Sequence, residues 1–370
     1  MTPHTRLLTL GLCLALSVGC KKDPGDSAGK EAAPAASATA APVAEQPPAL
    51  SVDDMKLPTL PEVPIPESNP QSEAKIDLGH RLFFDTRLSG DGKLSCYSCH
   101  QNEHGNGGET PLAIGAHGKK LPRHSPVIWN VGYLPKLYWD GRSDSLEAQA
   151  LAAWTGGNLG VGKENVDKKA KEIAALPEYK ARFAAAFPGE AVSPELVTKA
   201  LSAYERTLVC KDTSYDRYAK GDKSALSAEQ KAGLGLFMGK GLCTACHAPP
   251  HFSTAYFGQG AFFNTGMGTK GVEEKDVDVG RMKVTEKEQD WAAFKPPSLR
   301  HVAKSAPYFH DGSIATLREA VSFMATGGYD NKNKTPLLAN RGLTDAEIDQ
   351  IVAFLGALVC EGKLEPPAAP

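Results

Sequence analysis

The sequence lacks any run rich in lysine or arginine, although these residues number 41 among its 370. Aspartate and glutamate number 43, so the formal net charge at neutral pH is only −2. Nucleic acids and anionic membrane surfaces attract proteins through clustered basic side chains. We therefore expect no nucleic-acid partner and no electrostatic membrane patch.

Alternating β-branched residues and long apolar runs are also scarce. The apolar run at 7–19, "LLTLGLCLALSVG", is short for a membrane-spanning helix. It follows His4 and Arg6 and ends at Cys20, which is the layout of an export signal. We predict a signal peptide over residues 1–20 and, because Cys20 resembles a lipoprotein cysteine, a lipid anchor to a bacterial membrane in the periplasm. Ser17 stands where such signals most often have leucine, and an ordinary cleaved signal is the alternative.

The next segment has no apolar periodicity. Residues 21–57 are rich in alanine and proline, so we predict a flexible linker there.

Two cysteines remain when the signal and two repeated motifs have taken the other six of the eight. Cys210 and Cys360 both stand at the C-terminal ends of segments that we predict to be helices, 193–210 and 344–360. Export places the chain in an oxidising compartment, where such a pair can form a disulfide. Our hypothesis is a Cys210–Cys360 bridge, and the alternative is two buried thiols.

The pattern Cys-x-x-Cys-His occurs twice, as "SCYSCH" at 95–100 and "LCTACH" at 242–247. The similarity extends further, because aligning Asp140 with Asp311 also aligns the glycine that follows each and, five residues later, a leucine. A long repeat of this kind indicates two copies of one unit. We predict tandem domains at 58–225 and 226–362.

Helix-start signals dominate both halves. Ser227 with Gln230, and Thr344 with Glu347, have the spacing of a capping box. Glycine and proline gather in the connections between such segments. The fold class that we predict is all-α, with two small helical domains and long loops.

A histidine directly after Cys-x-x-Cys is typical of c-type haem attachment, in which both thiols bond to one haem and the imidazole binds its iron. Zinc binding is the alternative, since cysteine and histidine also ligate zinc. Export and the absence of a second Cys-x-x-Cys beside either motif favour haem. We predict two covalently bound c-type haems, held by Cys96, Cys99 and His100 and by Cys243, Cys246 and His247.

No methionine occurs between Met55 and Met238. The first haem therefore cannot take a methionine ligand from its own domain, and its remaining candidates for the sixth iron ligand are His104, His117 and His124, or no side chain. The second domain offers methionines at 267, 282 and 324. A methionine-ligated haem has the higher reduction potential, so the pattern indicates one electron carrier and one reaction centre.

Several longer motifs support this division of roles. "LFFDTRLSGDGKLSCYSCH", "YWDGRSDSLEAQA", "LSAYERTLVCKDTSYDRY" and "PPSLRHVAKSAPYFHDGSIATLREAV" stand in this order. Together they resemble the bacterial di-haem cytochrome c peroxidase family, which includes MauG. The resemblance covers residues from about Pro58 to Gly356 and implies two cytochrome c-like domains.

The resemblance also implies individual roles. Met324 matches the methionine ligand of the second haem, where MauG-like members have tyrosine, and Met267 is the alternative. His117 matches the histidine that caps the first, peroxide-reducing haem until the other haem is reduced. Trp139 matches a tryptophan between the haems, and Gln149 matches a glutamine in the peroxide pocket.

Two departures from the family pattern concern the first haem. The family segment NPxEM, whose glutamate moves protons, is replaced by "GGNLGVGKENV", in which Glu164 is displaced. Either His117, Glu164 or another group then takes that role, or turnover is poor. His124 replaces an asparagine that binds calcium together with backbone oxygens matching Ser305 and Pro307, and this change argues against calcium because Ca²⁺ prefers oxygen ligands.

The function that we predict from the resemblance is peroxidase activity. Hydrogen peroxide is reduced to water with electrons from a small cytochrome c or a cupredoxin. One alternative is a di-haem electron-transfer protein without this activity, and another is a MauG-like oxidase of a protein substrate. Many relatives are dimers, so the resemblance also allows a homodimer.

Overall fold

The computed structural model describes residues 51–258 and 261–368. The predicted signal peptide, Cys20 and nearly all of the predicted linker lie outside this range. Within it, regular secondary structure consists of helices, and β pairing is limited to isolated bridges. The α-helices are α1 (Glu73–Phe84), α2 (Leu146–Thr155), α3 (Val166–Ala174), α4 (Pro177–Ala186), α5 (Pro194–Glu205), α6 (Ser214–Ala219), α7 (Ala228–Met238), α8 (Met282–Thr285), α9 (Leu317–Ala325) and α10 (Asp345–Gly356). The predicted all-α fold class is confirmed.

The helices begin where the sequence signals indicated. Ser227 and Gln230 form a reciprocal capping box at the start of α7, and Thr344 and Glu347 form another at the start of α10. These side chains satisfy backbone groups that the first helical turn leaves unpaired. Helix α5 ends at Glu205 and α10 at Gly356, so the prediction that Cys210 and Cys360 stand at the ends of these helices is wrong: both lie several residues beyond them.

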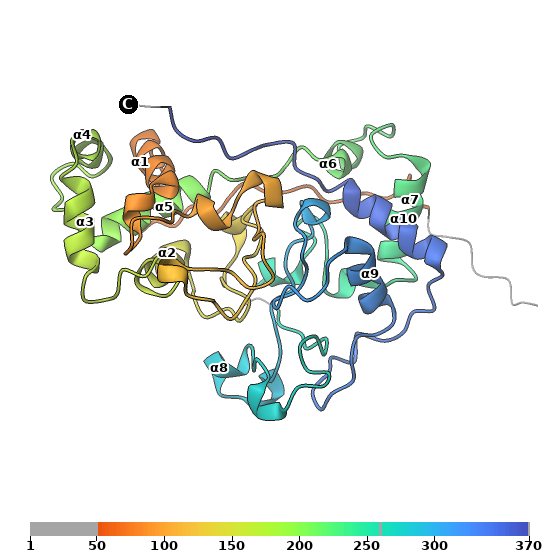
Figure 1. Ribbon diagram of the computed structural model, residues 1–370. Helices are drawn as coiled ribbons and strands as arrows, with labels where there is room; N and C mark the ends of the chain where they lie inside the picture. The colour runs from red at the N-terminus through yellow and green to blue at the C-terminus, as the bar shows by residue number, and fades with distance from the viewer. Residues whose placement is uncertain (1–50, 259–260, 369–370) are drawn as a thin grey trace, which may run out of the picture. The chain divides into compact units, whose positions relative to one another are not determined.

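Two groups of helices enclose two apolar cores (Figure 1). In the first, α5 packs against both α1 and α2; in the second, α10 packs against α7 and α9. Trp154 is fully buried in the first core, and Phe354 in the second. Val52 and Leu57 are buried against the second core, so the chain joins the folded structure before the predicted linker ends. The domain boundaries at 58–225 and 226–362 remain a prediction.

The internal repeat is visible in the backbone. The 3₁₀ helix Val131–Tyr133 corresponds to Val302–Lys304, and each follows a residue with left-handed φ, Asn130 at 65° and His301 at 68°. An antiparallel bridge then joins Leu137 to Ser143 in one copy and Tyr308 to Ile314 in the other. Helices α2 and α9 begin at matching positions. The two copies therefore share their loop geometry as well as their motifs.

Each repeat also contains one very close helix crossing. Gly79 of α1 lies against the backbone of Ala200 in α5, and Gly233 of α7 lies against the backbone of Gln350 in α10. A Cβ atom at either glycine would collide with the carbonyl oxygen of the facing helix. Only glycine allows these helices to pack at this distance.

Replacing Gly233 by alanine is expected to lower the free energy of unfolding by about 1–3 kcal/mol, because α7 and α10 must separate to admit the methyl group. Urea denaturation of the holoprotein would measure the loss. Gly356→Ala is the matched control, since a Cβ there has no neighbour within 4 Å. An equal effect of both substitutions would contradict the close-packing explanation.

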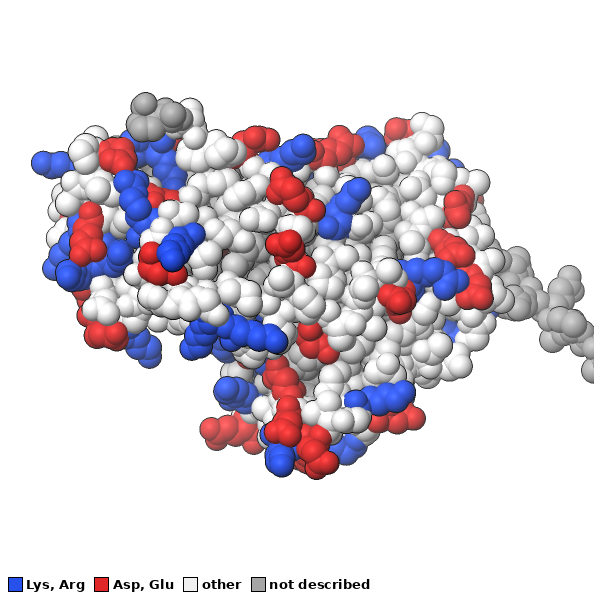
Figure 2. All heavy atoms as spheres, in the orientation of Figure 1, with Lys and Arg blue, Asp and Glu red and all other residues white. Residues whose placement is uncertain are grey.

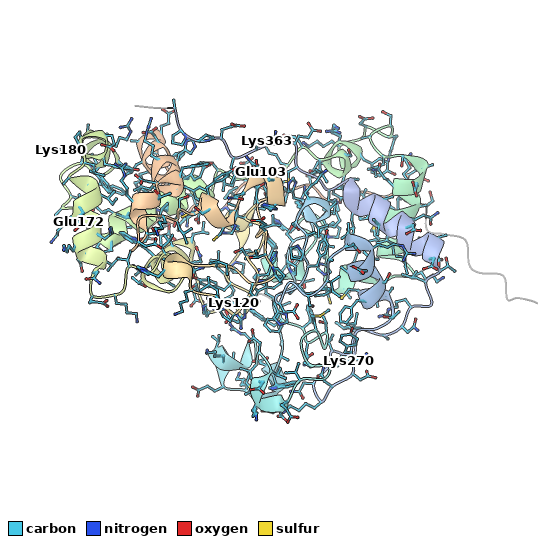
Figure 3. The ribbon with its side chains drawn as sticks, viewed as in Figure 1. Glu103, Lys120, Glu172, Lys180, Lys270 and Lys363 are labelled. Carbon is cyan, nitrogen blue, oxygen red and sulfur yellow. A yellow bond between two sulfur atoms is a disulfide. The ribbon has the colours of Figure 1, made fainter. Side chains whose placement is uncertain are left out.

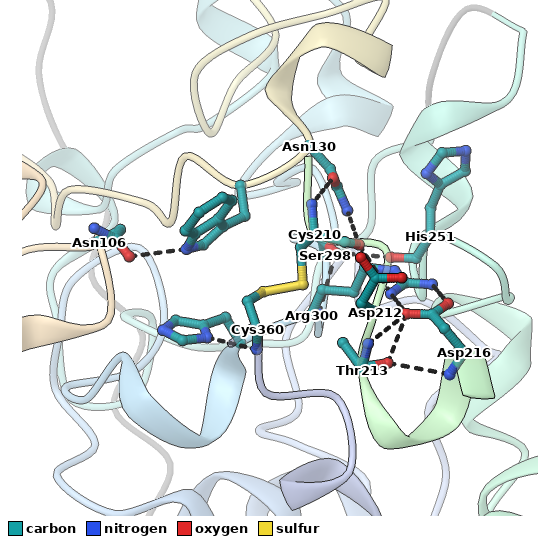
Figure 4. The surroundings of a disulfide bond; sticks show 12 residues. Asn106, Asn130, Cys210, Asp212, Thr213, Asp216, His251, Ser298, Arg300 and Cys360 are labelled. Carbon is teal, nitrogen blue, oxygen red and sulfur yellow. Dashed lines mark hydrogen bonds and ion pairs between the residues drawn. A yellow bond between two sulfur atoms is a disulfide. The ribbon is translucent and has the colours of Figure 1, made fainter. Parts of the chain in front are cut away.

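The structure confirms the Cys210–Cys360 disulfide (Figure 4), whose Cα atoms lie 5.4 Å apart. The backbone N–H of Cys210 donates to Asn130 Oδ1 at 2.8 Å, and that of Cys360 donates to His301 Nδ1 at 2.9 Å. Asn130 and His301 occupy equivalent places in the repeat, so the bridge joins equivalent positions. Beside it, the buried Arg300 guanidinium pairs with Asp216 at 2.7 Å and donates to the Cys210 carbonyl at 3.1 Å.

Charged side chains of both signs are interspersed over the face seen in Figure 2. Glu172 on α3 and Lys180 on α4, labelled in Figure 3, are examples of such exposed side chains. Across residues 51–258 and 261–368, no helix has the length and apolar character that crossing a bilayer requires.

Candidate functional site

Each Cys-x-x-Cys-His motif borders a cavity. The first cavity measures about 1120 Å³, and the second is narrower, at about 200 Å³. In both, a long helix leads into a glycine turn and then a short 3₁₀ helix that presents the motif, Tyr97–Cys99 in the first repeat and Cys243–Ala245 in the second. Both cysteines and the histidine of each motif line the corresponding cavity.

The two motif histidines are oriented in the same way. Nδ1 of His100 lies 3.1 Å from the carbonyl oxygen of Asn106, and Nδ1 of His247 lies 3.0 Å from that of Phe252. A carbonyl only accepts, so each Nδ1 carries the proton and donates. The proton-free Nε2 is then available to a metal, which is the usual arrangement of a ligating histidine.

Burial keeps these groups neutral before a cofactor binds. It lowers the pKa of His100 to about 4 and also lowers that of His247. It raises the pKa of Cys243 to about 12 and that of Cys246 to about 11. Neutral imidazoles and paired thiols are the donors that c-type haem attachment requires.

Met324 and His247 line the same cavity. Met324 is on α9, where the capping box of Thr316 and Glu319 starts the helix. Met267 is buried elsewhere, and its sulfur accepts a hydrogen bond of 3.1 Å from Ser313. Ligation of the second haem by Met324 remains a prediction, and the geometry favours it over Met267.

The structure separates the three candidate histidines of the first haem. His124 is buried and lines the first cavity, with Nδ1 3.0 Å from the carbonyl oxygen of Thr110. His117 is exposed and lies outside the cavity lining, and its backbone N–H donates to Asp91 at 2.8 Å. His104 is also outside the lining, 3.9 Å from Glu109. Capping of the iron by His117 stays a prediction.

Trp139 lies between the cavities and lines both of them. Its Nε1–H donates to the carbonyl oxygen of His124 at 2.9 Å, which fixes the orientation of the indole ring. Gln149, on α2, lines the first cavity. Ser305 and Pro307 line it as well, beside His124. Their contact with calcium remains untested, and the substitution at 124 still argues against it.

Glu205, at the end of α5, is an acid of the first cavity that the sequence analysis missed. Its Oε2 atom is buried without a hydrogen-bond partner. Burial raises the pKa of Glu205 to about 8; Arg206 opposes this rise and the Glu147 carboxylate adds to it. Arg206 is itself paired with Glu147 at 2.8 Å. The available signal was its position four residues after the buried Leu201, on the same helix face.

Lys295, which lines both cavities, was also missed. Lys295 is buried, and so is the Oε2 atom of Glu205. By contrast, Glu164 is exposed, outside the cavity lining, and hydrogen-bonded to the neighbouring Asn165 at 3.1 Å. The motif donors and these buried polar groups fit a haem in each cavity, since haem brings both iron and carboxylate groups.

A family model described as "Di-haem cytochrome c peroxidase" matches residues 73–224. Cytochrome-c peroxidase IdrP1 of Denitromonas iodatirespirans is 37% identical and aligns over 82% of this chain and 87% of that protein. Cytochrome c551 peroxidase of Pseudomonas aeruginosa is 35% identical over 80% and 83%.

Among solved structures, a MauG-like protein associated with microbial copper homeostasis superposes with a TM-score of 0.76 at 32% identity. The match covers 84% of this chain and 97% of that one. The sequence matches and the structural superposition therefore identify relatives of the same kind.

Proposed function

Because the chain belongs to the di-haem cytochrome c peroxidase family, we propose that it reduces hydrogen peroxide to water with electrons from a small cytochrome c or a cupredoxin. The observation that carries this proposal is a pair of cavities, each lined by a complete Cys-x-x-Cys-His motif, that meet at Trp139. When bound, the two c-type haems supply the redox chemistry.

The second cavity suits the entry of electrons. His247 and Met324 line it from two different elements, and together they would hold a haem by the His/Met pair that gives a high reduction potential. Trp139 offers an aromatic side chain in the wall towards the first cavity. Electrons from the donor would cross at this residue.

The first cavity suits peroxide chemistry. His100 lines this cavity, and among the residues that the structure describes no methionine does so. Gln149 offers an amide that can orient a small polar substrate. Peroxide reduction also takes up protons, and Glu205 holds a proton on its carboxyl group at neutral pH because burial disfavours the charged form. We assign proton supply to Glu205 in place of the displaced Glu164.

Oxidation of a protein substrate is a second candidate function, and the superposition on a MauG-like protein favours it. Met324 counts against it, because the resemblance implies tyrosine at that place in MauG-like members. Export to the periplasm and the lipid anchor at Cys20 also belong to the proposal and rest on the sequence signals alone. A homodimer rests on the family resemblance alone.

The proposal is tested by following peroxide-dependent oxidation of a reduced small cytochrome c by the purified holoprotein. Fully oxidised enzyme is compared with enzyme whose high-potential haem has been reduced beforehand. We expect rapid turnover after reduction, with His117 as the ligand that leaves. Turnover no faster than that of free haem in both states would reject the peroxidase and favour electron transfer.

A further inference from the structure

Lys295 lies in the segment that separates the two cavities. Its backbone N–H donates to the carbonyl oxygen of Trp139 at 2.8 Å, so the lysine is attached to the residue that lines both cavities. The residue is only 8% exposed. The lysine is thus held in the interior and not on the outer surface, where lysines normally lie.

The wall between the cavities is otherwise uncharged. Six residues line both cavities: Trp139, Lys295, Pro297, Val302, Tyr308 and Phe309. Lys295 alone among them carries a charge. One lysine residue therefore belongs to the lining of both cavities at once.

This ammonium has no anionic partner in the part of the chain that the structure describes. The other strongly buried cation of the first cavity differs, since Arg123 pairs with both Asp140 and Asp278 at 2.6 Å. Burial without a counter-charge lowers the pKa of Lys295 to about 8. Buried charges in proteins are normally paired, because removing an ion from water is costly. The missing partner is expected to be an anion that enters the cavities.

We propose that Lys295 binds propionate carboxylates of both haems and places one positive charge between the two irons. A haem carries carboxylates at its edge, and an ammonium group is a compact donor that can bind more than one of them. Positive charge nearby favours the reduced, less positive state of a haem iron. Lys295 then raises both reduction potentials together. The inference rests on the presence of two haems and not on peroxide turnover.

Spectroelectrochemical titration of the full holoprotein, without peroxide, tests this proposal. Lys295→Met keeps an apolar stem of similar length and removes the charge, and we expect the midpoint potentials of both haems to fall. Lys295→Arg keeps the charge, so we expect its two midpoint potentials to stay close to those of wild type. Lys240→Met is the matched control, because Lys240 forms an exposed pair with Glu347 and should leave both potentials unchanged. A shift at one haem only, or at neither, would overturn the shared site.

A vibrational measurement covers the case in which Lys295→Met does not retain two haems per chain. Resonance Raman spectra of wild type and Lys295→Arg are compared in the propionate bending region. Arginine changes the geometry of the carboxylate contact, so these bands should shift at both haems. Unchanged bands at either haem would reject the proposal. Because neither method uses peroxide, a failure here is distinct from a failure of the proposed peroxidase function.

Discussion

Replacing Met324 by leucine is expected to lower the midpoint potential of the second haem and to abolish turnover with reduced cytochrome c. A thioether ligand raises the potential of a haem, and axial ligands set potentials over a range of about 0.8 V. Leucine fills a similar volume on α9 but offers no lone pair. Potentiometric titration followed at each haem, together with the peroxidase assay, would record both effects.

Met267→Leu is the matched control for this substitution. Met267 is buried, but it lies outside the lining of the second cavity. We expect the Met267 variant to keep both potentials and its turnover. The opposite result, a lowered potential with Met267→Leu and none with Met324→Leu, would make Met267 the ligand.

Replacing Glu205 by glutamine is expected to reduce peroxide turnover about 100-fold, the lower end of what a positioned proton donor contributes. Glutamine keeps the shape of the side chain but cannot release a proton. In wild type, turnover should fall as the pH rises through the Glu205 pKa of about 8, because the protonated donor is then lost. This fall in turnover should be absent from the variant.

The free energy of unfolding should also fall as the pH rises, because of Glu205. The pKa of Glu205 in the folded chain lies above the ordinary value of 4.5. The protonated form therefore favours folding, and its stabilising effect is complete below pH 4.5 and lost as the pH rises through about 8. Urea denaturation across this window should show a slope in wild type that Glu205→Gln reduces.

Glu164→Gln serves as the control for proton supply, because Glu164 is an exposed acid outside the lining of the first cavity. It should leave turnover and its pH profile unchanged. Retained turnover with an unchanged pH profile in Glu205→Gln, or a large loss in Glu164→Gln, would reverse the assignment.

The sequence predicted those features that depend on local patterns. The haem motifs, the capping boxes and the disulfide each rest on a few residues whose chemistry has few alternatives. Met324 was placed by resemblance, and its place in the same cavity lining as His247 depends on the packing of α9 in the second repeat. The haem motifs and capping boxes span only a few residues of the chain. The disulfide and Met324 depend on residue types that few others could replace.

Glu205 and Lys295 were not predictable in the same way. For Glu205 the one sequence signal was its position four residues after Leu201 on the same face of a helix. No pattern beside Lys295 marks that residue as buried. Glu205 enters the first cavity because α5 packs against α1 and α2, and Lys295 lies between cavities because its segment passes Trp139. Such burial arises from contacts between distant segments, as does the packing of Val52 on the second core.

The cross-link between equivalent positions of the two repeats has a consequence for assembly. A single repeat would end in one unpaired cysteine and could form this bond only with a second molecule, at a rate set by protein concentration. Joined in tandem, the two thiols meet at the high effective concentration that a covalent tether provides. Oxidation of Cys210 and Cys360 is then independent of dilution.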